Sequence, residues 1–351
     1  MRKWIWVLVL LLGAFSGSAL AEKITLLGAG ATFPYPLYSK WFYVYYQKTG
    51  IKVNYQSIGS GGGIRQILAR TVDFGASDAP MTEEELAKAP AEILHIPMAL
   101  GAVVISYNLP GVPSGLKLTP EVLADIFLGK IRRWNDPRIV KLNPGLRLPG
   151  LPIVVVHRSD GSGTTFNFTY YLAQVSPEWK KRVGYGKAVR WPTGLGGKGN
   201  EGVTGYLKQL PGAIGYIELA YAHQNHLPVV ALQNKSGNFI LPTLKAISAA
   251  AKTKIPPDTR IILVNTDAPD GYPLSALTWI LVYKEQAYNG RSFERAKALV
   301  DLLWWCVHEG QQYNESLLYA RLPENLVRID EGLIRSITYQ GKPILGGCPG
   351  K

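Results

Sequence analysis

Cysteine, long apolar runs and acidic residues are all scarce in this chain of 351 residues. Only two cysteines occur, Cys306 and Cys348, and in an oxidising compartment they can pair as a disulfide. The apolar run Trp4–Phe15 covers 12 residues, well short of the roughly 20 that a membrane-spanning helix needs. No later stretch is long and apolar enough to span a bilayer, which argues against a membrane-embedded protein.

The first residues have the composition of an export signal. Arg2 and Lys3 supply a basic start, Trp4–Phe15 is the apolar segment, and a small-x-small cleavage site ends at Ala21. The sequence therefore predicts a signal peptide over residues 1–21 and a soluble mature protein after it. Because no cysteine near the cleavage site could carry a lipid anchor, we expect the mature protein in a periplasm, where an outer barrier retains it.

Negative charge is outweighed by positive charge, with 25 Asp and Glu against 38 Lys and Arg and a formal net charge of +13. Such an excess attracts nucleic acid, membrane surfaces or small anions. The densest basic clusters, Lys130–Arg133 and Lys180–Arg182, are short and far apart, unlike the concentrated basic face of a nucleic-acid-binding protein. We therefore expect small anions, and no nucleic acid, as partners.

Short apolar, β-rich runs alternate with helical patterns, which is typical of an α/β fold. In the first third of the chain, the predicted strands are Ile24–Leu27, Lys52–Ser57 and Val72–Gly75, and the predicted helices are Pro34–Tyr46, a helix ending near Arg70, and one capped by Thr82 with Glu85. Later in the chain, the predicted elements are helices Thr119–Leu128, Thr165–Val175 and Phe293–Val307 and strands Ile153–His157, Gly212–Ile217 and Leu277–Tyr283.

The length of the chain and the order of its elements favour two lobes rather than one core. The apolar run Val103–Tyr107 is suited to carry the chain into a second lobe. The predicted strand Leu277–Tyr283 and helix Phe293–Val307 are suited to return the chain to the first lobe. We expect a discontinuous first lobe over residues 22–105 and 267–351 and a second lobe over 106–266. Strands that cross between the lobes would form a hinge.

Four times, a predicted strand ends in small polar residues and a helix follows. These junctions carry the hydroxyls of Thr32, Ser60, Ser162 and Thr164 among glycines. Each helix start offers unpaired N–H groups and a positive dipole end, and glycines let the backbone approach a ligand closely. Because ligands of open α/β sheets lie beyond the carboxyl ends of strands, four such junctions predict a site for a small oxyanion.

Charged residues at two of these junctions narrow the choice of anion. Arg158 can hold two oxygens at once with its planar fork, and Asp160 is placed to orient it. Asp78 would repel an anion unless the ligand carries a proton that the carboxylate can accept. Phosphate carries such a proton near neutral pH and sulfate does not, so the pattern favours phosphate.

Five motifs together give the sequence a family resemblance. They are Gly28-Ala-Gly-Ala-Thr-Phe-Pro34, Ile58-Gly-Ser-Gly-Gly-Gly63, Asp73-Phe-Gly-Ala-Ser-Asp78, Arg158-x-Asp-Gly-Ser-Gly-Thr164 and Trp191-Pro-x-Gly-Leu-Gly-Gly-Lys-Gly-Asn200. In order and spacing they resemble the periplasmic phosphate-binding proteins of phosphate-specific ABC importers. The resemblance covers nearly all of the mature chain.

The resemblance implies a two-lobed periplasmic-binding-protein fold, each lobe with a mostly parallel sheet flanked by helices. It also implies a monomer that delivers inorganic phosphate to importer permease subunits, without a cofactor, a metal or catalysis. The residues that it places on phosphate are Thr32, Phe33, Ser60, Asp78, Arg158, Ser162, Gly163 and Thr164, with Asp160 behind Arg158. Gly61 departs from relatives that carry serine there, and Cys306 and Cys348 are outside the family pattern.

Other functions fit the residues less well. A dinucleotide site lacks the third glycine after Gly30, and the glycines after Gly194 do not follow a strand. A hydrolase elbow needs glycine two residues before the serine, but Ile58 stands there for Ser60 and Asp160 for Ser162. The pair His223 and His226 is spaced for one helix face but has no carboxylate partner apart from Glu218, so a metal site is not expected. A phosphatase, or a binder of arsenate or sulfate, on the same scaffold remains the alternative.

Overall fold

The computed structural model describes residues 24–346. The predicted signal peptide and Cys348 lie outside this range, so the signal and the disulfide stay predictions. Among the described helices, none combines the length and the hydropathy needed to cross a membrane.

Eight strands form one continuous sheet in the order β2-β1-β3-β11-β4-β8-β6-β7. Their bounds are Thr25–Gly30 (β1), Lys52–Ser57 (β2), Phe74–Ser77 (β3), Ile93–Tyr107 (β4), Val154–Arg158 (β6), Leu195–Gly197 (β7), Ala213–Glu218 (β8) and Ser275–Tyr283 (β11). Pairing is parallel towards both ends of the sheet, where β1 joins β2 and β3 and where β6 joins β7 and β8. In the middle, β11 and β4 run antiparallel to their neighbours.

Strand β4 divides the sheet into two parts, because its 15 residues pair first with β11 and then with β8. We call β2, β1, β3, β11 and Ile93–Ala102 of β4 the first half-sheet, and Val103–Tyr107 of β4 with β8, β6 and β7 the second half-sheet. Every residue of β4 is buried. The predicted crossing at Val103–Tyr107 is thus the last third of one long strand.

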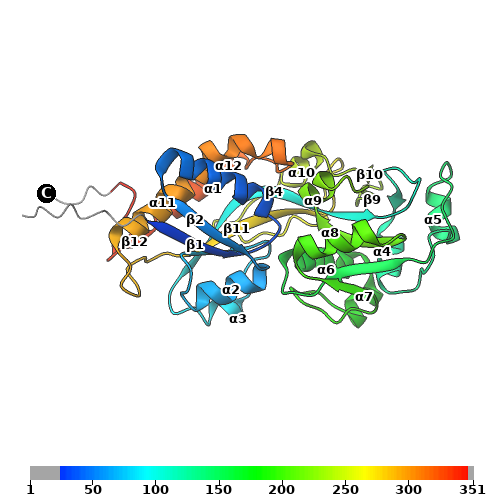
Figure 1. Ribbon diagram of the computed structural model, residues 1–351, viewed down its shortest axis with the longest axis horizontal. Coiled ribbons are helices and arrows are strands. Elements are labelled where there is room, and N and C mark those ends of the chain that lie inside the picture. Colours follow the sequence, from blue (N-terminus) through cyan, green and yellow to red (C-terminus); the bar gives the residue numbers. More distant parts are fainter. Residues whose placement is uncertain (1–23, 347–351) are drawn as a thin grey trace, which may run out of the picture.

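Helices cover both faces of the first half-sheet (Figure 1). Helices α1 (Tyr35–Thr49), α11 (Phe293–Val307) and α12 (Glu324–Arg335) pack against β2, β1 and β4 on one face. On the other face lie α2 (Ser60–Leu68), which packs on β1 and β3, and α3 (Glu83–Leu86). Two short 3-10 helices, Glu309–Tyr313 and Glu315–Leu317, follow α11.

The second half-sheet has its own helices (Figure 1). They are α4 (Pro120–Phe127), α5 (Pro137–Leu142), α6 (Gly163–Val175), α7 (Pro177–Arg182), α8 (Gly199–Gln209), α9 (Leu219–Gln224) and α10 (Leu244–Ala250). Of these, α8 packs on β6 and β8, and α6 packs on β8, α4 and α7. Small peripheral strands complete the fold: β5 (Lys117–Leu118), β9 (Ala231–Gln233), β10 (Phe239–Ile240), β12 (Thr338–Tyr339) and β13 (Lys342–Pro343).

The α/β architecture predicted from the sequence is confirmed, with corrections at element ends. Strand Lys52–Ser57 and helix Phe293–Val307 have the predicted bounds, and Thr82 forms the predicted capping box with Glu85. The third strand lies two residues later than predicted, at Phe74–Ser77. The helix predicted from Thr165 begins two residues earlier, because the Ser162 side chain caps its first turn.

The prediction that His223 and His226 share a helix face is wrong. Helix α9 ends at Gln224, and His226 lies beyond it in the left-handed region with φ 53°. Within residues 24–346, no group of three or more histidine, cysteine or acidic side chains is arranged to hold a metal ion.

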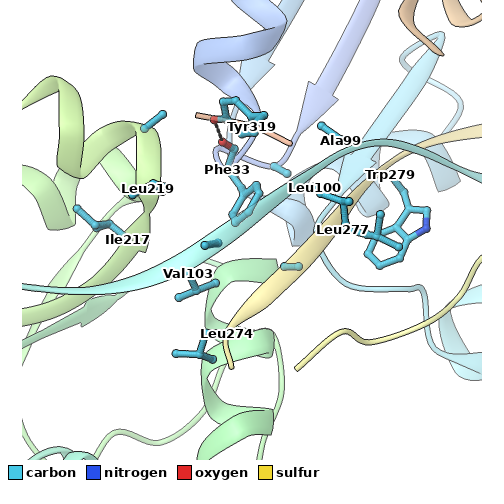
Figure 2. Close-up of a cluster of buried hydrophobic side chains, with 14 of the residues drawn as sticks. Phe33, Ala99, Leu100, Val103, Ile217, Leu219, Leu274, Leu277, Trp279 and Tyr319 are labelled. Carbon is cyan, nitrogen blue, oxygen red and sulfur yellow. Dashed lines mark hydrogen bonds between the residues drawn. The ribbon is translucent and has the colours of Figure 1, made fainter. Parts of the chain in front are cut away.

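A buried cluster fixes Phe33, the residue that follows the first strand–helix junction. Figure 2 shows its ring among Leu100, Val103 and the ring of Tyr319, where the two half-sheets meet. The ring has room there because residue 101 is glycine: a Cβ at Gly101 would lie 2.6 Å from the Phe33 ring. The Tyr319 hydroxyl donates to the Phe33 carbonyl at 2.7 Å, so both the side chain and the backbone of Phe33 are held.

Candidate functional site

The four predicted junctions meet at the boundary between the half-sheets. The parallel strands β1, β2 and β3 end at Gly30, Ser57 and Ser77, and β6, which runs the opposite way in the second half-sheet, ends at Arg158. The carboxyl ends of the strands in both half-sheets therefore point towards the boundary, where ligands of α/β sheets bind. Helices α2 and α6 begin there, from opposite sides. The Gly61 N–H donates to the Gly161 carbonyl at 2.9 Å, so the two halves are in direct contact.

Ser60 connects three of the predicted site residues. Its Oγ accepts hydrogen bonds from the backbone N–H of Gly163 at 3.0 Å and of Asp78 at 3.2 Å. Only glycine fits at position 163, because a Cβ there would lie 2.6 Å from the Ser60 Oγ and 2.8 Å from the Asp78 Cβ. The start of α6 can therefore approach the first half-sheet more closely than any side chain would allow.

Asp78 is 2% exposed and is surrounded by hydroxyl groups. The Thr278 Oγ1 donates to its Oδ1 at 2.8 Å, and the Ser60 Oγ lies 3.4 Å from its Oδ2. Burial raises the pKa of Asp78 to about 7, and the hydrogen bond from Thr278, the charge of Arg158 and the hydrogen bond from Ser60 offset this only in part. The carboxyl group can thus exchange a proton near neutral pH.

Arg158 is the buried cation of the site, with a side chain that is 1% exposed. Its Nε and Nη2 donate to the two oxygens of Asp160 at 2.7 and 2.6 Å, in the two-pronged geometry expected of this pair. Its Nη1 lies 3.3 Å from the Thr164 Oγ1. Burial alone would lower the pKa of Arg158. The hydrogen bond and the negative charge of Asp160 have the larger combined effect, so the pKa of Arg158 is raised.

Asp160 orients Arg158 as predicted and has a second contact. Its Oδ1 accepts the N–H of Gly199, in the first turn of α8, at 2.9 Å. Burial would raise the pKa of Asp160, but the hydrogen bond and charge of Arg158 lower it below the usual range. Helix α6 is capped by Ser162, whose Oγ accepts the Thr165 N–H at 3.0 Å.

Thr32 and Thr164, which come from different half-sheets, are joined by Asn200. The Asn200 Nδ2 donates to the Thr32 Oγ1 at 2.7 Å and lies 3.3 Å from the Thr164 Oγ1. The Asn200 Oδ1 in turn accepts the Glu218 N–H at 2.9 Å. All eight predicted ligand residues therefore lie in one buried, hydrogen-bonded region at the boundary between the half-sheets.

Four residues of this region were not predicted from the sequence. Asn200 stands in a recognised motif, but no role was assigned to it. Asn167 lies one turn into α6, where its Nδ2 donates to the Asp78 carbonyl at 2.6 Å. Tyr216 accepts the Arg158 N–H at 3.0 Å. Thr278 lies in the middle of β11 with no motif around it, so only its position beside β3 in the sheet reveals its contact with Asp78.

The arrangement combines one fixed cation, one carboxyl group with a near-neutral pKa, and several hydroxyl and backbone N–H donors. Such a set can hold a small oxyanion that itself carries a proton. The oxygens of the anion would accept hydrogen bonds from helix starts, hydroxyl groups or Arg158. The Asp78 carboxylate would accept a hydrogen bond from the protonated oxygen of the anion.

Comparisons with known proteins agree with this geometry. Residues 16–303 match the family model described as a PBP superfamily domain. The phosphate-binding protein PstS of Pasteurella multocida (strain Pm70) is 48% identical over 332 residues, covering 93% of this chain and 94% of that protein. PstS of Methanocaldococcus jannaschii is 42% identical over 332 residues and covers 88% of this chain and 85% of its own length.

Solved structures have the same fold at low sequence identity. A high-affinity periplasmic phosphate-binding protein (PfluDING), solved with phosphate bound, superposes with a TM-score of 0.70 at 20% identity, covering 88% of this chain and 93% of that one. The phosphate-binding protein of Stenotrophomonas maltophilia gives a TM-score of 0.68 at 16% identity, covering 87% and 92%. By its match to the family model and its identity to these relatives over nearly their full length, the chain belongs to the PBP superfamily and, within it, to the family of the phosphate-binding proteins PstS.

Proposed function

We propose that this protein binds inorganic phosphate between its two halves and delivers it to the permease subunits of an ABC importer. The eight proposed ligand residues are Thr32, Phe33, Ser60 and Asp78 on the first half-sheet and Arg158, Ser162, Gly163 and Thr164 on the second. Closure of the two halves around the ligand would place donors on opposite sides of the anion.

One observation carries the proposal: a buried Arg158 and a buried Asp78 come together where two helix starts meet. A bare carboxylate beside an anion costs several kcal/mol unless a donor satisfies it. A phosphate hydroxyl can supply that donor, whereas fully ionised sulfate cannot. The names of the relatives at 42–48% identity point to the same ligand.

The location, the lobes and the partners form part of the same proposal. We expect residues 1–21 to be removed on export, leaving a periplasmic monomer that binds and releases its ligand without chemical turnover. The pairing of β4, first with β11 and then with β8, supports lobes over residues 22–105 with 267–351 and over 106–266. The permease would then recognise the closed pair of lobes.

Identifying the bound anion tests the proposal directly. The mature protein, purified without added phosphate, should release about one equivalent of inorganic phosphate when it is unfolded. After exhaustive dialysis, calorimetry should give one tight site for phosphate and none of comparable affinity for sulfate. Arsenate, which carries a proton at the same pH, should compete. Tight binding of sulfate, or steady turnover of a chromogenic phosphoester, would contradict the proposal.

A further inference from the structure

A second cationic cavity lies at the opposite end of strand β1. Its volume is about 780 Å³, and its lining includes Thr25 and Leu27 of β1. Strand β1 runs from there to Gly30, just before Thr32. At about 3.3 Å per residue, Thr25 and Thr32 are separated by about 20 Å. The cavity is therefore distinct from the candidate phosphate site.

Arg70, Arg291 and Arg295 line this cavity, and two of them, Arg291 and Arg295, share the carboxylate of Asp73. Asp73 is 4% exposed. Its two oxygens accept bonds from Arg295 at 2.7 and 2.6 Å, and its Oδ2 also accepts the Leu27 N–H at 2.6 Å. The carboxylate is thus already fully engaged by one guanidinium and one backbone donor.

Arg291 forms a second ion pair with the same carboxylate. Its side chain is 5% exposed, and its Nη2 lies 2.9 Å from the Asp73 Oδ1. Its Nη1 donates to the Tyr288 hydroxyl at 2.8 Å, while its Nε is buried without a hydrogen-bond partner among the described residues. A buried guanidinium normally has its donors satisfied, so Asp73 and Tyr288 satisfy Arg291 only in part.

Arg70 has no acidic partner within residues 24–346. Its guanidinium lies 4.9 Å from the ring centre of Tyr283 and 5.0 Å from that of Tyr288, and no described carboxylate is within ion-pair distance. Its Nε is also buried without a partner. Tyrosine rings hold a cation in place but do not neutralise it.

We propose that this cavity, which we call the arginine pocket, binds a condensed inorganic phosphate such as triphosphate. Guanidinium groups match phosphate oxygens in pairs, and Arg70 and Arg291, beside the Arg295–Asp73 pair, suit an anion with several phosphoryl groups. The volume exceeds what a single phosphate needs and falls in the range of small-ligand sites. The acidic Glu294 also lines the cavity, but it is exposed and lies in the first turn of α11, where the helix dipole favours a carboxylate.

Calorimetry with sodium triphosphate tests the arginine pocket. The protein is first saturated with inorganic phosphate, so that the site between the half-sheets is occupied. We expect a second binding event with a stoichiometry near one, weakened about tenfold or more by Arg70→Asn and by Arg291→Met. Asparagine is chosen because residue 70 has φ 55°, a conformation that asparagine tolerates. Methionine at 291 leaves Asp73 paired with Arg295.

The matched control is Arg147→Asn, which removes the same charge from an exposed position with no ion pair among the described residues. It should leave triphosphate binding unchanged, and none of the three variants should alter phosphate binding. The proposal is overturned if no second event is seen, if the control weakens it equally, if triphosphate merely displaces phosphate, or if citrate binds the pocket as tightly as triphosphate.

Discussion

Asp78 and Arg158 contribute different properties to the site, although their opposite charges lie in the same buried region. Arg158 is held by Asp160 with both prongs of its guanidinium occupied, so only its Nη1 side and its charge face the ligand region. Asp78 is held by two hydroxyl groups, and its pKa of about 7 makes its protonation state depend on pH. In the proposed site we therefore expect attraction to come mainly from Arg158 and selectivity from Asp78.

The selectivity of the site should depend on pH through Asp78. Above a pH of about 7 its carboxylate accepts a proton from phosphate and repels sulfate. Below that pH it is protonated and can donate to sulfate, so rejection of sulfate should weaken as the pH falls. In Asp78→Asn the amide donates to either anion at every pH. The ratio of phosphate to sulfate affinities, measured by competition from pH 5 to 8, should rise with pH in the parent and be lower and flatter in the variant.

The asparagine variant also controls for the titration of phosphate itself, which occurs in both proteins. If the variant discriminates between the anions as well as the parent does, Asp78 is not the selectivity element.

Arg158→Ala should nearly abolish phosphate binding. The change removes the buried cation and leaves Asp160 without its partner, a loss on the order of 2–5 kcal/mol for a buried charge pair. Arg158→Lys should recover only part of the affinity, because an ammonium group cannot reproduce the fork that holds Asp160. Calorimetry measures both. Near-native affinity in the alanine variant would place the anion elsewhere.

At the scale of elements, an ion pair links the loop before β7 to helix α3 across the boundary. The Lys187 Nζ lies 2.7 Å from the Glu85 Oε2, and the two side chains are 13% and 25% exposed. The Lys187 carbonyl also accepts the N–H of Ser162 at 2.8 Å. The pair thus joins the capped start of α3 in one half to the segment that supports the start of α6 in the other.

Lys187→Met should speed the release of phosphate. The ion pair can form only when the halves are closed, so its loss destabilises the closed form, by about 1 kcal/mol for a partly exposed pair. Stopped-flow measurements should show a dissociation rate several times that of the parent at low salt, and a smaller difference at high salt.

The matched variant Lys130→Met breaks the ion pairs of Lys130 with Glu178 and Asp125, all of which lie within the second half. It should not change the release rate. Equal acceleration in both variants would show that Lys187 does not act across the boundary.

Local patterns were enough to predict most elements and the site, but not the sheet order. Ser60, Asp78 and Arg158 stand in short motifs at strand ends. Glycines and hydroxyl groups at such positions indicate an anion site, because they allow a close backbone approach and donate hydrogen bonds. Thr278 has no such local signal, since its role follows from β11 lying beside β3, about 200 residues apart in sequence. Long-range pairing of this kind is not encoded in the periodicity of either strand.

For the whole molecule, phosphate should favour the closed form. Donors on both half-sheets contact one ligand only after closure, so the ligand stabilises that form by its extra affinity for it. Small-angle scattering of the dialysed protein should show a larger radius of gyration than the phosphate-saturated protein. An identical profile in both conditions would indicate a rigid site instead.

The single strand β4 also has a consequence for how the chain folds. The first half-sheet needs β11, from Ser275 onward, before its centre is complete, and the second half-sheet needs β4, which the first half-sheet shares. The strands of the second half-sheet follow one another between Val103 and Glu218, whereas the first half-sheet stays incomplete until β11 is added, and contacts between distant segments slow folding. We therefore expect the first half-sheet to form last, after synthesis of the chain has passed Tyr283 at the end of β11.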